Sequence, residues 1–248
     1  MGEVIAVVSG KGGTGKTSFV AGVGAALAIL GKRVLCIDCD VGLRNLDISL
    51  GLSDRALMDF FDVAREKCTL EEAAVVHPKI ANLFLLTAPV SIRGGWITPE
   101  QMRGLIRQVK SSFDYCFLDA PAGLDTGFRL ATCAADRAVV VSTTDITSLR
   151  DAQRTVMLLD SKFGQNKLHL VVNRVRRKML RNLHSTIDDA IDTAGAPLLG
   201  IVPEDEVLPM ALNRGIPLLL VDSPLAAKAY YNIAQRITGL RVPLMKIR

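Results

Sequence analysis

The stretch Gly10-Lys11-Gly12-Gly13-Thr14-Gly15-Lys16-Thr17 decides the fold of this 248-residue chain. It carries two glycines, a lysine and a hydroxyl residue at the spacing of a phosphate loop. The apolar run Val4–Val8 precedes it and an alanine-rich stretch from Ser18 to Leu30 follows it, so the strand and the helix that flank a phosphate loop are both expected. The motif predicts a site for a nucleoside triphosphate with magnesium.

Each part of the motif has an expected role at the phosphates. The glycines let the backbone curl so that its N–H groups point at phosphate oxygens, and the helix that begins near Lys16 adds its positive end. We expect Lys16 to neutralise the terminal phosphates and the Thr17 hydroxyl to bind the metal. The predicted nucleotide contacts in this segment are Gly10, Lys11, Gly12, Gly13, Thr14, Gly15, Lys16, Thr17 and Ser18.

Lys11 is the unusual residue of the motif, because an ordinary phosphate loop does not need a lysine directly after its first glycine. With it, the motif resembles that of the deviant Walker A ATPases, the MinD/ParA family, and the resemblance extends over nearly the whole chain. It implies a P-loop NTPase that binds ATP with Mg²⁺ and dimerises with ATP. It also implies that Lys11 reaches the nucleotide of the partner protomer, so that Lys11 and Lys16 are both catalytic. A solvated loop lysine is the alternative interpretation of Lys11.

Eight short apolar runs alternate with amphipathic stretches, and most of the runs are apolar at every position, as in strands covered by helices on both faces. Thr98-Pro99-Glu100-Gln101 has the N-cap, proline and capping-box residue of a helix start, and Ser223-Pro224 predicts another. We predict a doubly wound α/β fold with a mostly parallel sheet of about eight strands and helices on both faces. The expected strands are Val4–Val8, Val34–Ile37, Leu83–Leu86, Tyr115–Leu118, Ala138–Ser142, Leu168–Val172, Leu198–Val202 and Leu218–Val221.

Composition favours one domain, since 49% of the residues are apolar and no Pro/Gly/Ser-rich linker divides the chain. We assign residues 1–238 to a single P-loop domain and residues 239–248 to a short basic and apolar tail. No apolar run approaches the roughly 18 residues of a spanning helix, and the start of the chain lacks a targeting pattern. Five scattered cysteines fit a reducing compartment. These features predict a cytoplasmic protein.

Two carboxylates, Asp38 and Asp40, follow the second expected strand, at the sheet edge where ligands bind in open α/β folds. The next residues, Val41–Asp47, closely resemble the first switch segment of the MinD branch of the family. By that match Asp40 orients the attacking water, Asp38 lies in the outer shell of the magnesium ion, and Arg44 and Asn45 belong to the switch and the dimer contact. A solvated acidic turn is the alternative for Asp40.

Asp119 ends an apolar run and precedes Ala120-Pro121-Ala122-Gly123. This arrangement resembles a Walker B motif followed by the second switch, with a glycine placed for close approach of the backbone to the γ-phosphate. The family usually has serine or threonine at position 120, so Ala120 removes one hydroxyl near the metal. The predicted magnesium site is Thr17, Asp38 and Asp119, partly through water, and the switch residues here are Pro121 and Gly123.

Asn173 ends the expected strand Leu168–Val172 and matches the asparagine that binds the base in the family. We assign Asn173 to the adenine edge and Arg174 to stacking on the base. The turn Pro203-Glu204-Asp205 resembles the one that flanks adenine in these proteins. A strand-terminal asparagine that only forms a turn is the alternative.

The segment Arg174–Arg181 holds five positive charges in eight residues, which is enough for contact with a nucleic-acid backbone if they share a face. Aromatic residues are absent from it, and this favours a solvated helix start. Cys36 and Cys39 have the spacing of a metal or redox motif, but no second pair follows, so we expect them only to pack.

The tail Leu240–Arg248 is much shorter than the basic amphipathic helix with which the MinD branch contacts membranes. We therefore expect weak, transient contact with the inner face of the cell membrane. The function that the resemblance implies is an ATP-dependent homodimer of the MinD type that hydrolyses ATP, responds to an activating partner protein and controls the position of the division site. A ParA-like ATPase that binds DNA nonspecifically for partitioning is the leading alternative, and a regulatory module that binds ATP without useful turnover is the third.

Overall fold

The computed structural model describes residues 1–92, 94–164, 166–176, 187–221 and 225–245. Eight strands form one sheet in the order β3-β4-β2-β5-β1-β6-β7-β8, and all neighbours are parallel except β3, which pairs antiparallel with β4 at one edge. The strands are β1 (Glu3–Val8), β2 (Val34–Asp38), β3 (Val75–Val76), β4 (Leu83–Leu86), β5 (Tyr115–Asp119), β6 (Arg137–Ser142), β7 (Leu168–Val175) and β8 (Leu198–Pro203).

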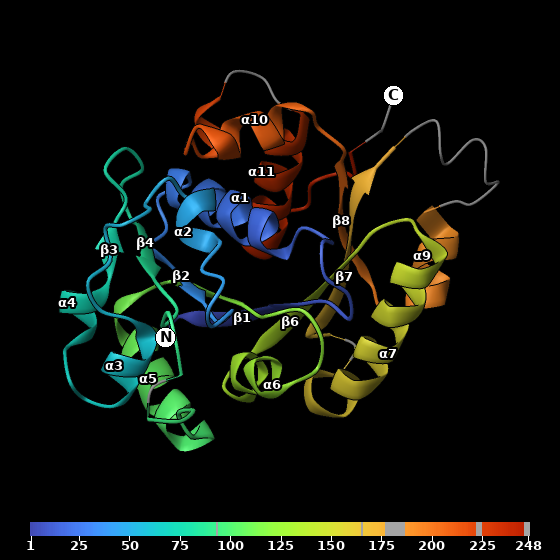
Figure 1. The fold of residues 1–248 in the computed structure, drawn as a ribbon. Coiled ribbons are helices and arrows are strands. Elements are labelled where there is room, and N and C mark those ends of the chain that lie inside the picture. The colour runs from blue at the N-terminus through green and yellow to red at the C-terminus, as the bar shows by residue number, and fades with distance from the viewer. Residues whose placement is uncertain (93, 165, 177–186, 222–224, 246–248) are drawn as a thin grey trace.

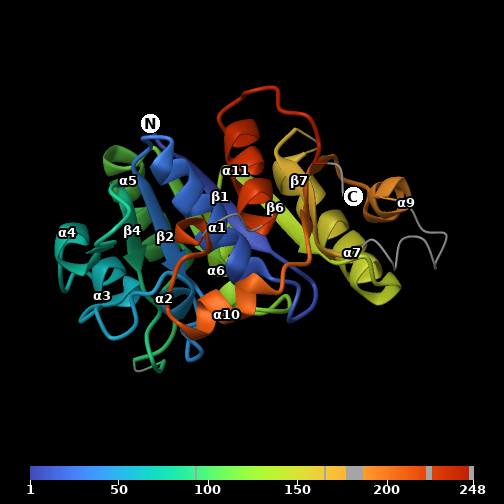
Figure 2. The ribbon, with the colours of Figure 1, turned by 90° about the horizontal axis from the view of Figure 1, so that it is seen from above.

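Helices cover both faces of the sheet (Figures 1 and 2). Alternate residues of the central strand β1 enter two separate cores, since Val4 and Ala6 pack on one face and Ile5 and Val7 on the other. The core around Ile5 is closed by α1 (Lys16–Ile29), α2 (Leu46–Ser49), α10 (Val207–Asn213) and α11 (Leu225–Ile237). The core around Val4 is closed by α3 (Phe60–Ala64), α4 (Leu70–Ala73), α5 (Pro99–Ser112), α6 (Thr126–Cys133), α7 (Ile146–Phe163) and α9 (Ile187–Ala194).

The doubly wound, mostly parallel fold is confirmed, and so are seven of the eight expected strands. The helix start at Thr98 is also confirmed, because Thr98 and Gln101 form a capping box around Pro99. Ser223-Pro224 lies outside the described residues.

The expected strand Leu218–Val221 is wrong. Leu218–Leu220 forms one turn of 3₁₀-helix, η1, which follows Pro217 and buries Leu218 against the α1 face. A short apolar run can equally be a buried helical turn. The eighth strand is instead Val75–Val76, which is too short to produce a sequence pattern.

The segment after α11 folds back on this helix. Arg236 holds it by donating from Nε to the Val242 carbonyl (2.9 Å) and from Nη1 to the Leu199 carbonyl of β8 (2.9 Å). Met245 packs against the core under α11. Lys246–Arg248 lie outside the described residues. Within the described part of the chain, no helix is both long enough and apolar enough to cross a membrane.

Candidate functional site: a phosphate loop at the carboxyl edge of the sheet

The phosphate loop connects β1 to α1 at the centre of the sheet. Gly13 and Gly15 have φ angles of 77° and 91°, a left-handed conformation that glycine adopts without strain. Gly15 is the N-cap of α1, and neither a capping side chain nor an acidic residue in the first turn occupies the first N–H groups of the helix. A Cβ atom at Gly15 would lie 2.2 Å from Asn173 Nδ2, so the close approach of β7 also requires a glycine here.

The two lysines of the loop lie in different environments. Lys16 is buried, and its Nζ donates to the Ser9 hydroxyl (2.8 Å), which in turn donates to the Lys11 carbonyl (2.6 Å). Lys11 itself is exposed and its Nζ lies 3.4 Å from Thr147 Oγ1 in the first turn of α7. The Lys16 ammonium group therefore lies inside the loop, whereas the Lys11 side chain faces outward. Sequence reasoning missed Ser9, because no feature of the motif identifies the residue before the first glycine as a partner of the lysine.

Asp38 and Asp119 are direct neighbours at the ends of the paired strands β2 and β5. Both are almost fully buried. Burial raises the pKa of Asp38 to about 6, against hydrogen bonds that its carboxylate accepts from the Asp40 and Leu46 amides. Burial and the nearby Asp38 carboxylate raise the pKa of Asp119 to about 8, although Lys16 and the Thr17 hydroxyl oppose this shift. Two neighbouring buried carboxyl groups favour the binding of a cation, which would lie between them and the phosphates of a nucleotide.

The residues fit a magnesium ion. Asp119 Oδ1 is buried without a hydrogen-bond partner in the described part of the chain, and the Thr17 hydroxyl lies near enough to this carboxylate to lower its pKa. A carboxylate oxygen and a hydroxyl are hard ligands of the kind that magnesium prefers. The described residues contain no group of three or more His, Cys, Asp or Glu that could hold a metal alone. A metal at this place needs phosphate oxygens and water as further ligands, as in other phosphate-loop sites.

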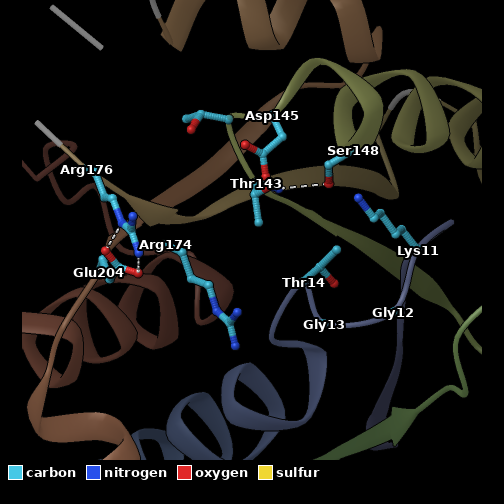
Figure 3. A pocket seen from close by; sticks show the side chains of 11 residues that line it. Lys11, Gly12, Gly13, Thr14, Thr143, Asp145, Ser148, Arg174, Arg176 and Glu204 are labelled. Atoms are coloured by element: carbon cyan, nitrogen blue, oxygen red, sulfur yellow. Dashed lines mark hydrogen bonds and ion pairs between the residues drawn. The ribbon is translucent and has the colours of Figure 1, made fainter. Parts of the chain in front are cut away.

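Two pockets open on either side of the loop. One of about 410 Å³ lies toward the metal residues and is lined by Gly15, Lys16, Thr17, Ser18, Asp40, Leu43, Asn45, Ile48, Ala120, Ala122 and Arg174, among others. The other, of about 300 Å³, lies between the outer turn of the loop, the start of α7 and the ends of β7 and β8 (Figure 3). Arg174 lines both pockets, and Figure 3 places its side chain between the loop and the Arg176–Glu204 pair.

The first switch segment lies beside the metal residues. Asp40 is half-buried, and burial raises its pKa while Lys16 lowers it. Arg44 has a φ of 47°, and its guanidinium contacts Thr87 Oγ1 (3.0 Å) and Asp47 (3.6 Å), so it braces this segment internally. Asn45 is exposed at the mouth of the larger pocket.

The second switch turn follows Asp119. Gly123 has a φ of 88°, a conformation that disfavours any side chain. Pro121 packs against α6, where a Cβ atom at Gly127 would lie 2.5 Å from its ring. Ala122 lines the larger pocket, so the turn faces the phosphate end of the site.

The residues expected at the base are largely occupied by internal contacts. Asn173 is buried, its Nδ2 donates to the Thr14 carbonyl (2.8 Å), and its Oδ1 accepts from the Arg174 amide (2.9 Å). Asp205 accepts from the Val207 and Ala226 amides, both at 3.0 Å, and thereby holds the starts of α10 and α11. Glu204, which follows Pro203 at the end of β8, is paired with Arg176. The Asn173 and Asp205 side chains thus have structural bonds that the sequence did not predict.

The sequence pattern of the CobQ/CobB/MinD/ParA nucleotide binding domain matches residues 5–218. The chain belongs to this family. The septum site-determining protein MinD of Synechocystis sp. is 40% identical to this chain over 247 residues. The aligned region covers 99% of this chain and 92% of the Synechocystis protein. Among solved structures, the MinC:MinD cell division protein complex of Aquifex aeolicus aligns with a TM-score of 0.91, 37% identity and 98% coverage of both chains. MinD of Pyrococcus horikoshii, solved with Mg-ADP, aligns with a TM-score of 0.80, 28% identity and 96% coverage of both chains.

These comparisons confirm the expected resemblance to the MinD branch of the MinD/ParA family and the expected nucleotide-binding domain. The family consists of P-loop ATPases. The roles of single residues stay predictions. The basic segment Arg174–Arg181 falls mostly outside the described residues, and of its described part Arg176 is paired with Glu204. Cys36 and Cys39 are buried free cysteines, in line with simple packing.

Proposed function

We propose that this chain is a dimerising switch ATPase of the MinD type that hydrolyses ATP to control the position of the cell-division site. The observation that supports this most directly is the meeting of the outward-facing Lys11, the buried Lys16 and the Asp38–Asp119 pair at one edge of the sheet. An ordinary phosphate-loop site needs the last three, and only a site completed by a second protomer needs Lys11 as well. The MinD relatives, at about 40% identity over the full chain, support the cellular role.

The reaction is attack of water on the γ-phosphate, for which the protein supplies position and charge. The free amides of the loop and of the first turn of α1 hold the phosphate oxygens. Lys16 leaves its Ser9 contact to neutralise charge that develops on the leaving phosphates, and Lys11 of the partner protomer adds a second positive charge. Asp40, at the mouth of the same pocket, orients the attacking water.

Thr17, Asp38 and Asp119 would hold the magnesium ion, with Asp38 acting through water. The ion would supply positive charge at the phosphate oxygens when bound. The buried, unpartnered Asp119 Oδ1 is the atom that most needs such a partner. Because both carboxyl groups have raised pKa values, we infer that metal binding releases protons from this pair.

The base end would be formed by Asn173, Arg174 and the turn Pro203-Glu204-Asp205. Arg174 has a φ of 54°, which is unusual for a residue with a side chain and is common at ligand clamps. Its side chain lies within 4.0 Å of a Cβ atom placed on Gly15, so it must move when a nucleotide covers the loop. After this movement, the Arg174 guanidinium would stack on the adenine.

We further propose that the ATP-bound homodimer binds a protein that stimulates turnover. The relative from Aquifex aeolicus was solved as a MinC:MinD complex, so a partner protein is known for that family member. Residues 1–238 would act as one domain. The tail would add weak membrane contact through Leu244, which is about half exposed.

The test is to follow ATP hydrolysis and sedimentation of the wild-type protein with ATP and Mg²⁺, with Lys16→Ala as the variant that loses nucleotide binding. Co-sedimentation with anionic liposomes and with DNA, run side by side, separates a MinD-type from a ParA-type surface. We expect weak, salt-sensitive liposome binding that requires ATP and is lost in Leu244→Glu. A wild-type protein that stays monomeric with ATP, or that pellets with DNA alone, contradicts the proposal.

A further inference from the structure

Tyr230 of α11 has a buried hydroxyl that no assigned role explains. Its side chain is fully buried, and the hydroxyl has no hydrogen-bond partner among the residues that the structure describes. A buried polar group without a partner is destabilising, and nearly all such groups in folded proteins find one. A phenylalanine would fill the same space without this loss of stability. A tyrosine at this position therefore indicates a role for the hydroxyl.

The ring of Tyr230 is fixed on the helix that begins at the phosphate loop. It packs edge-on against Phe19 of α1, with the ring centroids 6.3 Å apart. It also lies directly on Gly22, where a Cβ atom would come within 2.2 Å of Tyr230 Cδ2. The position of the ring is therefore set by α1, and the hydroxyl cannot turn to another partner without moving this contact.

The hydroxyl points toward the base end of the site. Asp205 binds the Ala226 amide in the first turn of α11, and Tyr230 lies one turn later on the same face of the helix. Side chains on a helix lean toward its N-terminus, which directs this hydroxyl toward the ends of β7 and β8. In agreement, the charges of Arg174 and Asp205 both act on the pKa of the Tyr230 phenol, which burial raises.

We infer that the Tyr230 hydroxyl is a positioning group for the base end of the nucleotide site, unpartnered until a bound adenine nucleotide brings Asn173 and Arg174, in the irregular end of β7, onto it. The inference rests on the proposed ATP-binding function and adds a residue to it. The end of β7 is the part able to move, because its register with β8 shifts between Val172 and Val175 and Arg174 has a left-handed backbone. Tyr230 then links the end of β7, which contacts the base, to helix α1, which holds the phosphates.

The experiment compares Tyr230→Phe with Tyr231→Phe, a matched control that removes a hydroxyl from the adjacent, partly exposed tyrosine. Three quantities are measured for each protein: the melting temperature without nucleotide, the Kd for Mg-ADP, and the Kd for magnesium tripolyphosphate, which lacks the base. For Tyr230→Phe we expect an equal or higher melting temperature, a Kd for ADP raised by roughly 3- to 10-fold, and an unchanged Kd for tripolyphosphate. Tyr231→Phe should leave all three unchanged.

Each other result overturns the inference. An unchanged Kd for ADP in Tyr230→Phe means that the hydroxyl is idle in both states. A lower melting temperature with both ligands weakened alike means that it serves only the packing of α11 on α1. Wild-type protein that binds neither ADP nor tripolyphosphate refutes the proposed function itself, a result that is distinct from either of these.

Discussion

The phosphate end and the base end of the nucleotide site are prepared in opposite ways. At the phosphate end, no described side chain caps the amides of the first turn of α1, and the buried Asp119 Oδ1 has no partner among the same residues. At the base end, Asn173 and Asp205 are both occupied by hydrogen bonds within the protein. The first end is preorganised for a ligand, whereas the second must exchange internal bonds for those to the ligand.

The difference has an energetic meaning. Preorganised donors and charges cost nothing at the moment of binding, because folding has already placed them. The Asn173 bonds must be given up before the amide can read a base, and each is worth only about 1 kcal/mol net. We therefore expect phosphate contacts to dominate affinity and base contacts to tune it.

The largest effect is expected for Lys11→Ala. The loop amides and Lys16 remain, so nucleotide affinity should stay close to that of the wild type, whereas dimerisation with ATP should be lost and turnover should fall by roughly 1,000-fold, as for other charges supplied across an interface. Sedimentation velocity with ATP and a phosphate-release assay measure the two effects, and Lys79→Ala at an exposed site is the control. A dimer of normal strength in Lys11→Ala would show that the outward-facing lysine does not act across the interface.

Asp40→Ala should have the next largest effect. Loss of the group that orients water should slow hydrolysis by about 100-fold, and the phosphate cradle and Thr17 are untouched, so the ATP-bound dimer should accumulate. Single-turnover hydrolysis and the lifetime of the dimer are the measurements, with Asp160→Ala on the exposed side of α7 as a control. If Asp40→Ala hydrolyses ATP at the wild-type rate in a single turnover, another group orders the water.

The phosphate end and the base end also differ in how well the sequence predicts them. The phosphate loop is contiguous, so its spacing identifies Lys16 and Thr17 together, and in the structure both act on the pKa of Asp119. The base end is built by long-range contacts such as that between Asn173 and Thr14, which no local pattern contains.

The errors in the fold have the same origin. Leu218–Val221 reads as a strand because four apolar residues do not reveal whether a neighbouring strand exists. Val75–Val76 becomes a strand only because β4 lies beside it. In the same way, the contact of Tyr230 with Gly22 joins two helices that are far apart in sequence, so neither residue stood out.

Asp119→Asn should change how the free energy of unfolding depends on pH, because it removes a buried carboxyl group from the phosphate end of the site. The pKa of Asp119 is about 8 in the folded protein and near 3.8 when unfolded, so the folded state holds the extra proton. Its stabilising contribution is complete below pH 4 and is lost as the pH rises toward 8, by up to about 1.4 kcal/mol per pH unit. Without nucleotide, the wild type should therefore lose stability between pH 6 and 8.

The Asp119→Asn variant should lose less stability over that interval, while its affinity for Mg-ADP falls. Urea unfolding at pH 6, 7 and 8 gives the first quantity and calorimetric titration gives the second. The comparison starts at pH 6 because Asp38, with a pKa of about 6, contributes at lower pH in both proteins. Parallel pH profiles for the two proteins would mean that the Asp119 carboxyl is already ionised in the nucleotide-free fold.

Asn173→Ala has the smallest expected effect and tests the base end directly. The substitution leaves the buried Thr14 carbonyl and the Arg174 amide without their partners, so the free energy of unfolding should fall by about 1–3 kcal/mol. If Asn173 also reads adenine, the Kd for Mg-ADP should rise several-fold more than that for tripolyphosphate, with Asn166→Ala at an exposed position as the control. Equal losses for the two ligands would show that Asn173 only supports the phosphate loop, and the site would then discriminate bases through Arg174 and the turn Pro203–Asp205 alone.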